Sequence, residues 1–319
     1  MKIVILDGSA ANPGDISWDE ISKFGELTVY DVTKEDEIID RVKDAEIAIT
    51  NKTPFTKETI EQLPNLKYIG VLATGFNVVD LKACAQREIV VTNVPEYSTF
   101  ATMQHTIALL LSMTNHVASH SSSVHNGDWI MSSQFCYWNE SLIELYGKTI
   151  VIVGFGKIGR QVAAAVKAFG MNVIAVPHSM PKNKDEFEGI EFDVFENAIK
   201  KADFITLHCP LTDETKEIIN ASSIALMKND VRIINAARGG LVNERDLRSA
   251  LESGKIAHYA ADVVSVEPML ENNPLYKAPN CTLTPHIAWA PKETRERLIT
   301  IAAENIECFL KGSPINKVN

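Results

Sequence analysis

The amino-acid sequence predicts an α/β protein with two parallel-sheet domains separated by a cleft. A chain of 319 residues exceeds the size at which a single hydrophobic core normally keeps growing. Short runs rich in β-branched residues alternate with helical patterns, which is typical of βα units with a parallel sheet. The alternation stops near Ser98 and starts again at KTIVIVGFG. The sequence therefore contains two series of βα units.

The first series occupies residues 1–97. Helical patterns, among them KEDEIIDRVKD and TKETIEQL, separate its β-type runs. These runs are KIVIL, TVYDV, EIAIT, KYIGVL and IVVT. We expect them to pair as parallel strands with helices on both faces of the sheet.

The segment from Ser98 to Gly127 predicts one long helix with an apolar centre. The loop-like segment 128–146 follows it and contains four aromatic residues at high density: Trp129, Phe135, Tyr137 and Trp138. Exposed aromatic residues at that density favour a subunit interface. The alternative is a local cap that packs on the chain's own surface.

The first series predicts a Rossmann-like or flavodoxin-like domain. The second series predicts a Rossmann-like dinucleotide-binding domain over residues 98–290. Its β-type runs are KTIVIV, MNVIAV, FITLHC, VRIINAA, AHYAADV and CTLTP. After Pro291 comes a single amphipathic helix with no following strand. We expect this helix to complete a discontinuous substrate domain of residues 1–97 plus 291–319. The ligand site would lie in the cleft between the two domains.

Composition excludes several classes of function. The N-terminus has no long apolar segment and no small-residue cleavage site, so we expect neither a signal peptide nor a membrane span. Five scattered cysteines without a CxxC pair favour a reducing, cytoplasmic location and argue against a bound metal. A net charge of -10 disfavours nucleic acid and anionic membranes as partners. Small-molecule chemistry remains.

GFGKIG predicts a dinucleotide site because it follows the run TIVIV and opens a helical pattern. Gly154 would permit the tight turn, Gly156 would let the backbone approach a pyrophosphate, and Gly159 would allow close packing of helix and strand. The amides of the first helical turn would then meet the phosphates. A simple strand-to-helix turn is the less favoured alternative.

The choice between NAD(H) and NADP(H) stays open. An NAD site usually has Asp or Glu at the end of the next strand, to hold the ribose hydroxyls. Here that strand is followed by Pro177, His178 and Ser179. Side chains that could contact a 2′-phosphate are His178, Ser179, Lys182 and Lys184.

Arg238, Glu267 and His286 fit the chemistry of 2-keto acid reduction. A guanidinium can bind a carboxylate with two hydrogen bonds, and Arg238 stands just after a strand. His286 can give and take a proton near neutral pH. Glu267 would hydrogen-bond the far nitrogen of that imidazole and favour its charged form. Each residue alone fits an ordinary loop, but three of them at strand ends of one domain favour a function.

The other histidines fit this role less well. Four of them, His105, His116, His120 and His125, lie on or near the long helix, where surface exposure or packing is the expectation.

With these motifs taken together, the chain resembles the D-isomer-specific 2-hydroxyacid dehydrogenases over its full length. The resemblance rests on GFGKIG, HCPLTDET, INAARGGLVNE, ADVVSVEP and TPHIAW. VLATGFNVVD, NVPEYST and PHIAWAPKETRERL are most similar to the glycerate dehydrogenase, or hydroxypyruvate reductase, branch. The resemblance implies hydride transfer between NAD(P)H and a small 2-keto acid. Hydroxypyruvate or glyoxylate is favoured, which would give D-glycerate or glycolate.

The resemblance also implies roles for particular residues. Arg238, Glu267 and His286 would form the catalytic trio, with His286 as general acid and base. The substrate would be bound by Lys52, Arg238 and the backbone amides of Thr74 and Gly75. Asp262 would receive the nicotinamide carboxamide, and Met103 would lie against the ring. The full cofactor-binding set is Met103, Gly154, Gly156, Lys157, Ile158, Gly159, His178, Ser179, Cys209, Pro210, Thr215, Ala236, Ala237, Asp262 and His286.

Members of this family are usually homodimers with an arm that embraces the partner, which matches residues 128–146. Two positions depart from the family: Pro177 replaces the usual acidic residue, and Gln104 stands where many members have Glu. A dinucleotide-sensing, co-repressor-like binding protein on the same scaffold is the main alternative. A formate dehydrogenase would have Gln in place of Glu267.

Overall fold

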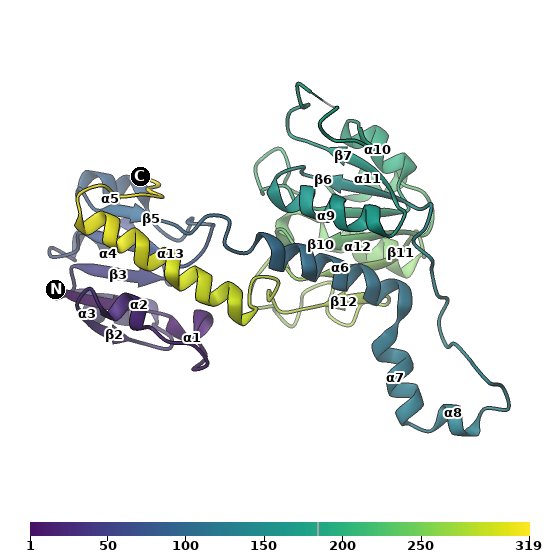
Figure 1. Cartoon of the computed structure of the whole chain (residues 1–319), viewed down its shortest axis with the longest axis horizontal. Coiled ribbons are helices and arrows are strands. Elements are labelled where there is room, and N and C mark those ends of the chain that lie inside the picture. Colours follow the sequence, from purple (N-terminus) through teal and green to yellow (C-terminus); the bar gives the residue numbers. More distant parts are fainter. Residues whose placement is uncertain (184) are drawn as a thin grey trace. The chain divides into compact units, whose positions relative to one another are not determined.

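The computed structural model describes residues 1–183 and 185–319, which form two compact units (Figure 1). The first unit contains Met1–Ser98 and Trp289–Asn319, and the second contains Thr99–Ala288. Each is built on one parallel sheet with packed helices, so the predicted α/β class with two parallel-sheet domains is confirmed. Within the described ranges, no helix has the length and apolar character needed to span a membrane.

The first unit has five strands in the order β2-β1-β3-β4-β5, which is the flavodoxin-like order. The strands are β1 (Lys2–Ile5), β2 (Glu26–Val29), β3 (Ile47–Thr50), β4 (Tyr68–Val71) and β5 (Val90–Thr92). The helices are α1 (Gly8–Ala11), α2 (Asp19–Ser22), η1 (Glu35–Glu37), α3 (Ile38–Val42), α4 (Lys57–Glu61), α5 (Leu81–Gln86) and α13 (Lys292–Leu310). β2 ends before the predicted run TVYDV does, because the carbonyls of Tyr30 and Asp31 accept from Gly8 and Ser9 at the start of α1.

The C-terminal helix α13 packs on the sheet of the first unit, as Figure 1 shows. Its buried Leu298, Ile299 and Ile306 join the core formed by strands β1 and β3. Arg295 fixes the start of the helix, because its guanidinium forms two 2.7 Å hydrogen bonds to Asp15. Packing on the sheet removes the apolar face of the helix from water, and this burial is the main source of the helix's stability.

The second unit has seven strands in the order β12-β11-β10-β9-β6-β7-β8. When the strands are numbered in chain order from β6, the six strands β6 to β11 follow the Rossmann order 3-2-1-4-5-6. The strands are β6 (Thr149–Val153), β7 (Asn172–Val176), β8 (Ile190–Phe192), β9 (Phe204–Leu207), β10 (Val231–Asn235), β11 (Ile256–Ala261) and β12 (Cys281–Leu283). The helices are α6 (Thr99–Asn115), α7 (Val117–His125), α8 (Asp128–Met131), α9 (Lys157–Ala168), α10 (Phe195–Lys201), α11 (Ala221–Leu226), η2 (Gly239–Leu241) and α12 (Glu244–Glu252). The sequence pattern missed β8, a three-residue edge strand with Glu191 at its centre.

The expectation of one helix from Ser98 to Gly127 is wrong. α6 ends at Asn115, and α7 begins at Val117 after a break at His116. His116 has the left-handed conformation, with φ +48°, which ends a right-handed helix. No glycine or proline marks this position, so the sequence pattern had no signal for the break.

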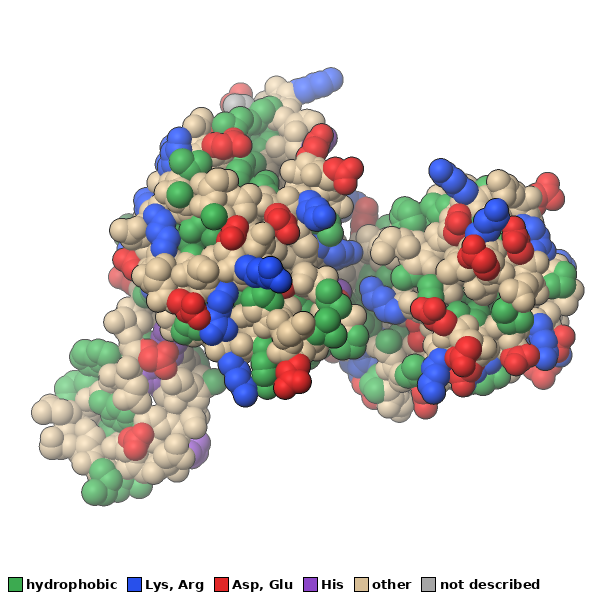
Figure 2. Space-filling view, turned by 180° about the vertical axis from the view of Figure 1, so that it is seen from behind, with side chains coloured by type: hydrophobic (Ala, Val, Ile, Leu, Met, Phe, Trp, Pro, Cys, Tyr) green, Lys and Arg blue, Asp and Glu red, His purple; other side chains and the backbone are tan. Residues whose placement is uncertain are grey.

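Residues 128–146 project from the second unit (Figure 1) and carry exposed apolar side chains (Figure 2). The largest exposed fractions are 86% for Ile130, 85% for Met131 and 88% for Phe135. Tyr137 does fold back, since its hydroxyl lies 3.0 Å from the Ser123 hydroxyl. The chain's own surface leaves most of this apolar area uncovered, so the local-cap alternative is wrong.

Candidate active site

The candidate residues of the second unit lie at one edge of its sheet. GFGKIG follows β6, Cys209 follows β9, and Arg238 follows β10. Glu267 lies in the segment after β11, and His286 follows β12. All these strands are parallel, so their carboxyl ends meet at the same edge, where ligands of open α/β sheets bind.

Two of the three glycines in the loop lie against the protein backbone, and the third faces open space. Gly154 has φ +94°, and a Cβ there would lie 2.4 Å from the Cys209 amide nitrogen. A Cβ on Gly159 would lie 2.2 Å from the Gly154 carbonyl oxygen. A Cβ on Gly156 would meet nothing within 4 Å. The space beside Gly156 and the first amides of α9 therefore suit a pyrophosphate.

The end of β7 carries no acidic side chain. Val176 is followed by Pro177 and by the exposed residues His178 and Ser179. Lys182 is exposed as well, and Lys184 lies outside the described residues. One cation that the sequence reasoning did not name lies on α9: the Arg160 guanidinium is 5.0 Å from the centroid of the Phe187 ring.

The remaining cofactor candidates border the same edge. Thr215 folds the segment after β9 into a turn, because its hydroxyl donates to the Pro210 carbonyl at 2.6 Å. Burial raises the pKa of the Cys209 thiol, which therefore stays uncharged at neutral pH. Met103 and Ile158 are half-buried against the core beside α9. Three further candidates are the exposed Lys157 and the half-buried Ala236 and Ala237.

Arg238 is exposed in the loop after β10. Buried Asn235 shapes that loop: its side chain donates to the Arg238 carbonyl at 2.9 Å and accepts from the Ala237 amide at 3.0 Å. The Arg238 guanidinium donates to the Ala237 carbonyl at 2.7 Å. The loop backbone is therefore fixed while the cationic group faces solvent.

His286 and Glu267 form an ion-pair geometry. Nδ1 of His286 lies 2.6 Å from Oε2 of Glu267, and the two side chains are 30% and 35% exposed. The backbone of His286 is left-handed, with φ +55°, which is costly for a residue with a side chain. Its amide donates to the Asp262 carbonyl at 2.8 Å, and that bond helps hold this conformation.

The Asp262 carboxylate holds the loop that carries His286. It is 1% exposed and accepts from the Thr284 hydroxyl at 2.6 Å and from the amides of Ile287 and Ala288 at 2.8 and 2.7 Å. Burial alone would raise the pKa of Asp262, but these hydrogen bonds and one from His105 outweigh burial and lower it. Asp262 is therefore a charged acceptor in the fold as well as a cofactor candidate.

His105 was expected to serve helix surface or packing, and the structure shows which packing contact it makes. Its Nε2 lies 2.9 Å from the Thr284 hydroxyl and 3.4 Å from the Asp262 carboxylate. His105 thus ties α6 to the His286 loop. The position of His105 in the helical pattern did not indicate this contact.

In the first unit, Lys52 lies in the loop after β3. Its backbone is held by buried Asp7, whose carboxylate accepts from the amides of Asn51, Lys52 and Thr53 at 2.7, 2.6 and 2.8 Å. Sequence reasoning missed Asp7, because its partners lie more than forty residues away.

Thr74 and Gly75 lie in the loop after β4. The Thr74 hydroxyl donates to the Val94 carbonyl at 3.1 Å, and the Asn93 side chain donates to the Thr74 carbonyl at 2.8 Å. These two bonds fix the backbone whose amides are the substrate-binding candidates.

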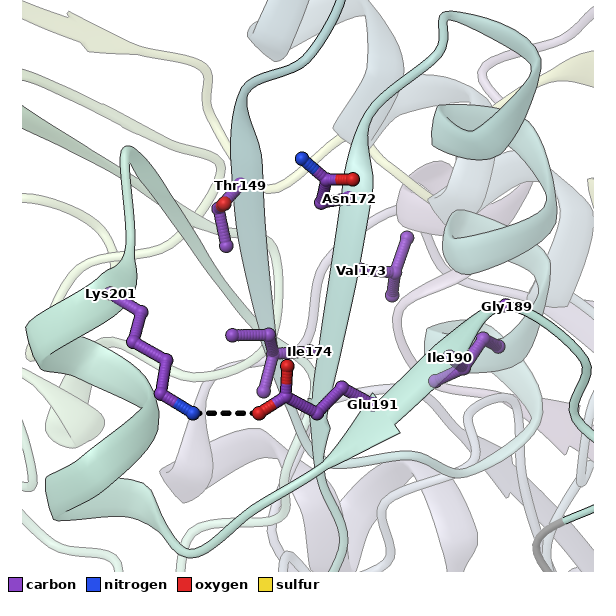
Figure 3. Close-up of a pocket in the computed structure, with 8 residues that line it drawn as sticks. All are labelled: Thr149, Asn172, Val173, Ile174, Gly189, Ile190, Glu191 and Lys201. Carbon is purple, nitrogen blue, oxygen red and sulfur yellow. Dashed lines mark hydrogen bonds and ion pairs between the residues drawn. The ribbon is translucent and has the colours of Figure 1, made fainter.

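A cavity of about 540 Å³ in the second unit lies away from the candidate residues of that same unit (Figure 3). Thr149, Asn172 and Ile190, at the amino-terminal ends of β6, β7 and β8, line it. In Figure 3, Lys201 and Glu191 point toward one another, and their charged atoms are 2.6 Å apart. This cavity is at the opposite edge of the sheet from the glycine loop, and its cation is already paired.

The described residues hold no group of three His, Cys, Asp or Glu side chains suited to a metal ion. What the carboxyl-terminal edge offers is a guanidinium, an imidazole paired with a carboxylate, and a glycine loop at a helix N-terminus. This set can bind a carboxylate, exchange a proton and hold a dinucleotide.

Residues 107–288 match the family model for the D-isomer specific 2-hydroxyacid dehydrogenase, NAD binding domain. The chain is 47% identical to a hydroxypyruvate reductase of Blautia hydrogenotrophica over 100% of both chains. It is 37% identical to a glycerate dehydrogenase of Methylorubrum extorquens over 99% of this chain and 98% of that one. The structure of an acyclic imino acid reductase in complex with NADPH and D-Arg superposes with a TM-score of 0.85, at 32% identity and full coverage of both chains.

The glycine loop, the two sheet topologies and these full-length similarities agree with one another. The chain belongs to the D-isomer specific 2-hydroxyacid dehydrogenase family and is an oxidoreductase that uses NAD(H) or NADP(H).

Proposed function

We propose that the protein reduces a small polar 2-keto acid, hydroxypyruvate or glyoxylate, to D-glycerate or glycolate. The observation that carries this proposal is the 2.6 Å pair between His286 and Glu267, at the sheet edge that also bears Arg238. The similarity to a hydroxypyruvate reductase and a glycerate dehydrogenase supports the choice of substrate.

In this mechanism the bound nicotinamide supplies the hydride. His286 presents a proton from Nε2 to the carbonyl oxygen of the substrate, while Glu267 accepts from Nδ1 and stabilises the imidazolium. Arg238 binds the substrate carboxylate and polarises the adjacent carbonyl. In the reverse reaction His286 takes the proton back.

We propose Lys52 and the backbone amides of Thr74 and Gly75 as further donors to the substrate carboxylate. Support comes from the way the first unit fixes both loops, through Asp7 and through Asn93. Fixed donors lose little entropy when a substrate binds.

A substrate panel tests the function. The purified protein is mixed with NADH or NADPH and with hydroxypyruvate, glyoxylate, pyruvate or a bulkier 2-keto acid, and loss of the nicotinamide absorbance is followed. We expect the highest kcat/KM with hydroxypyruvate or glyoxylate. Absence of turnover with every 2-keto acid, combined with tight dinucleotide binding, would favour the co-repressor-like sensor.

Replacing Pro177 by Asp should shift cofactor preference toward NADH. A carboxylate at the end of β7 can accept from the ribose hydroxyls of NADH but repels a 2′-phosphate. We expect kcat/KM for NADPH to fall roughly fivefold or more, with little loss for NADH, because one unit charge close to a phosphate is worth about 1 kcal/mol or more.

The neutral variant Pro177→Asn controls for loss of the proline ring. If Asn and Asp change the NADPH/NADH ratio equally, charge at this position does not select the cofactor.

We also propose a homodimer in which residues 128–146 form the contact. The exposed side chains of Ile130, Met131 and Phe135 support it, because neighbouring exposed apolar side chains of this size are typical of an interaction surface. A groove of about 460 Å³ runs between α6 and α7, with Leu111, Val117 and small residues along it, and could accept such side chains.

Ile130→Glu should therefore weaken the dimer strongly, because a carboxylate would be buried in an apolar contact. Light scattering coupled to size-exclusion chromatography would show monomer at concentrations where the wild type is dimeric. Val32→Glu, at an exposed apolar position of the first unit, is the matched control and should leave the mass unchanged. An unchanged mass for Ile130→Glu would rule out this contact.

A further inference from the structure

Glu244 is a buried carboxylate to which neither the sequence motifs nor the proposed mechanism gives a role. It is the first residue of α12, six positions after Arg238, and it is 8% exposed. Burying a carboxylate is costly unless hydrogen bonds compensate. Its contacts should therefore show why it is there.

Three hydrogen bonds of Glu244 reach the segment that carries Glu267. Oε1 accepts from the Ser265 amide at 2.7 Å, and Oε2 accepts from the Ser265 hydroxyl at 2.6 Å. Oε2 also accepts from the side chain of buried Asn273 at 2.9 Å. One carboxylate thus holds this segment on both sides of Glu267.

The same segment is in close contact with the Arg238 loop. A Cβ on Gly239 would lie 1.9 Å from the carbonyl carbon of Val264 and 2.4 Å from the Ser265 nitrogen. The Val264 amide donates to Oε1 of Glu267 at 3.3 Å, and Oε2 of Glu267 meets His286. The chain of contacts therefore runs from Glu244 through the Val264–Ser265 backbone to Glu267.

We infer that Glu244 is a positioning residue that aligns Glu267 with His286 and couples their geometry to the Arg238 loop. The inference rests on the proposed function of the Glu267 and His286 pair. Glu244 itself touches neither reacting atoms nor cofactor in this scheme. Misplacement of a catalytic group by about 1 Å can cost roughly a hundredfold in rate.

Kinetics of Glu244→Ala and Glu244→Gln test the inference. We expect the alanine variant to lose roughly 10–100-fold in kcat, with the KM of the cofactor changed by less than about twofold. The alkaline limb of its kcat profile for keto-acid reduction should move to lower pH, because a misaligned Glu267 favours the imidazolium less.

Glu244→Gln should show a smaller loss and a smaller shift of the same sign. Its Oε1 can still accept from Ser265, but its amide group opposes the donor of Asn273. This variant keeps the volume of the side chain, so it decides the question if the alanine variant does not fold. Native kcat and native pH profile in every folded Glu244 variant would overturn the inference.

Two control variants distinguish a positioning role from a general loss of stability and from failure of the mechanism itself. Ser223→Ala removes a buried capping bond of α11 and should lower the melting temperature without moving the pH profile. Glu267→Gln should lower kcat and shift the alkaline limb by itself. If Glu267→Gln has no such effect, the proposed function fails; if it has and the Glu244 variants do not, only the role of Glu244 fails.

Discussion

His286→Ala is expected to lower kcat by roughly two or more orders of magnitude, the usual contribution of a positioned general acid. The imidazole is the group that the proposed mechanism uses to protonate the carbonyl oxygen, and an alanine side chain carries no proton to give. Steady-state reduction of the best 2-keto acid at saturating NAD(P)H measures the loss. Dinucleotide binding, followed by fluorescence titration, should stay within about threefold of the wild type.

His125→Ala is the matched control, because this exposed histidine lies on α7, away from the sheet edge. Its kcat should match that of the wild type. A His286→Ala enzyme with near-normal kcat would remove His286 from the mechanism, whatever else the pair with Glu267 does for the fold.

Arg238→Lys should lower kcat/KM for the 2-keto acid by roughly 30-fold or more, although the charge is kept. A lysine ammonium cannot reproduce two parallel hydrogen bonds to a carboxylate, and loss of one partner of such a pair costs about 2–5 kcal/mol. We expect both a higher KM and a lower kcat, since the guanidinium also polarises the carbonyl. Stopped-flow reduction at several substrate concentrations would separate the two effects.

Arg245→Lys provides the comparison, because Arg245 is exposed on α12, seven positions from Arg238. It should leave both constants unchanged. Equal behaviour of the two variants would mean that Arg238 does not bind the substrate carboxylate.

The sequence allowed the two sheets and the order of the functional segments to be predicted, because both depend on local patterns. Alternation of β-type and helical runs marks each βα unit, and GFGKIG marks its own turn. Such patterns do not indicate where a single residue takes up a left-handed backbone conformation. For this reason the break at His116 was not predicted.

The supports of the candidate site could not be predicted for a different physical reason. Asp7, Glu244 and Asp262 bind amides and hydroxyls that lie about 20 to 45 residues away along the chain. The role of these three acids can be recognised only in the folded chain, where strands from distant segments align and bring their loops to one edge of a sheet. Sequence reasoning could name candidate residues for the chemistry but not the acids that hold their loops.

The lowered pKa of Asp262 links the His286 loop to the behaviour of the protein in acid. A carboxylate whose pKa is lower in the folded than in the unfolded state stabilises the fold above its ordinary pKa. That contribution is lost as pH falls through the lowered value, when the folded protein must also bind the proton. The amides of Ile287 and Ala288 would then lose their charged acceptor, so acid would loosen the loop that carries His286 and the native state together.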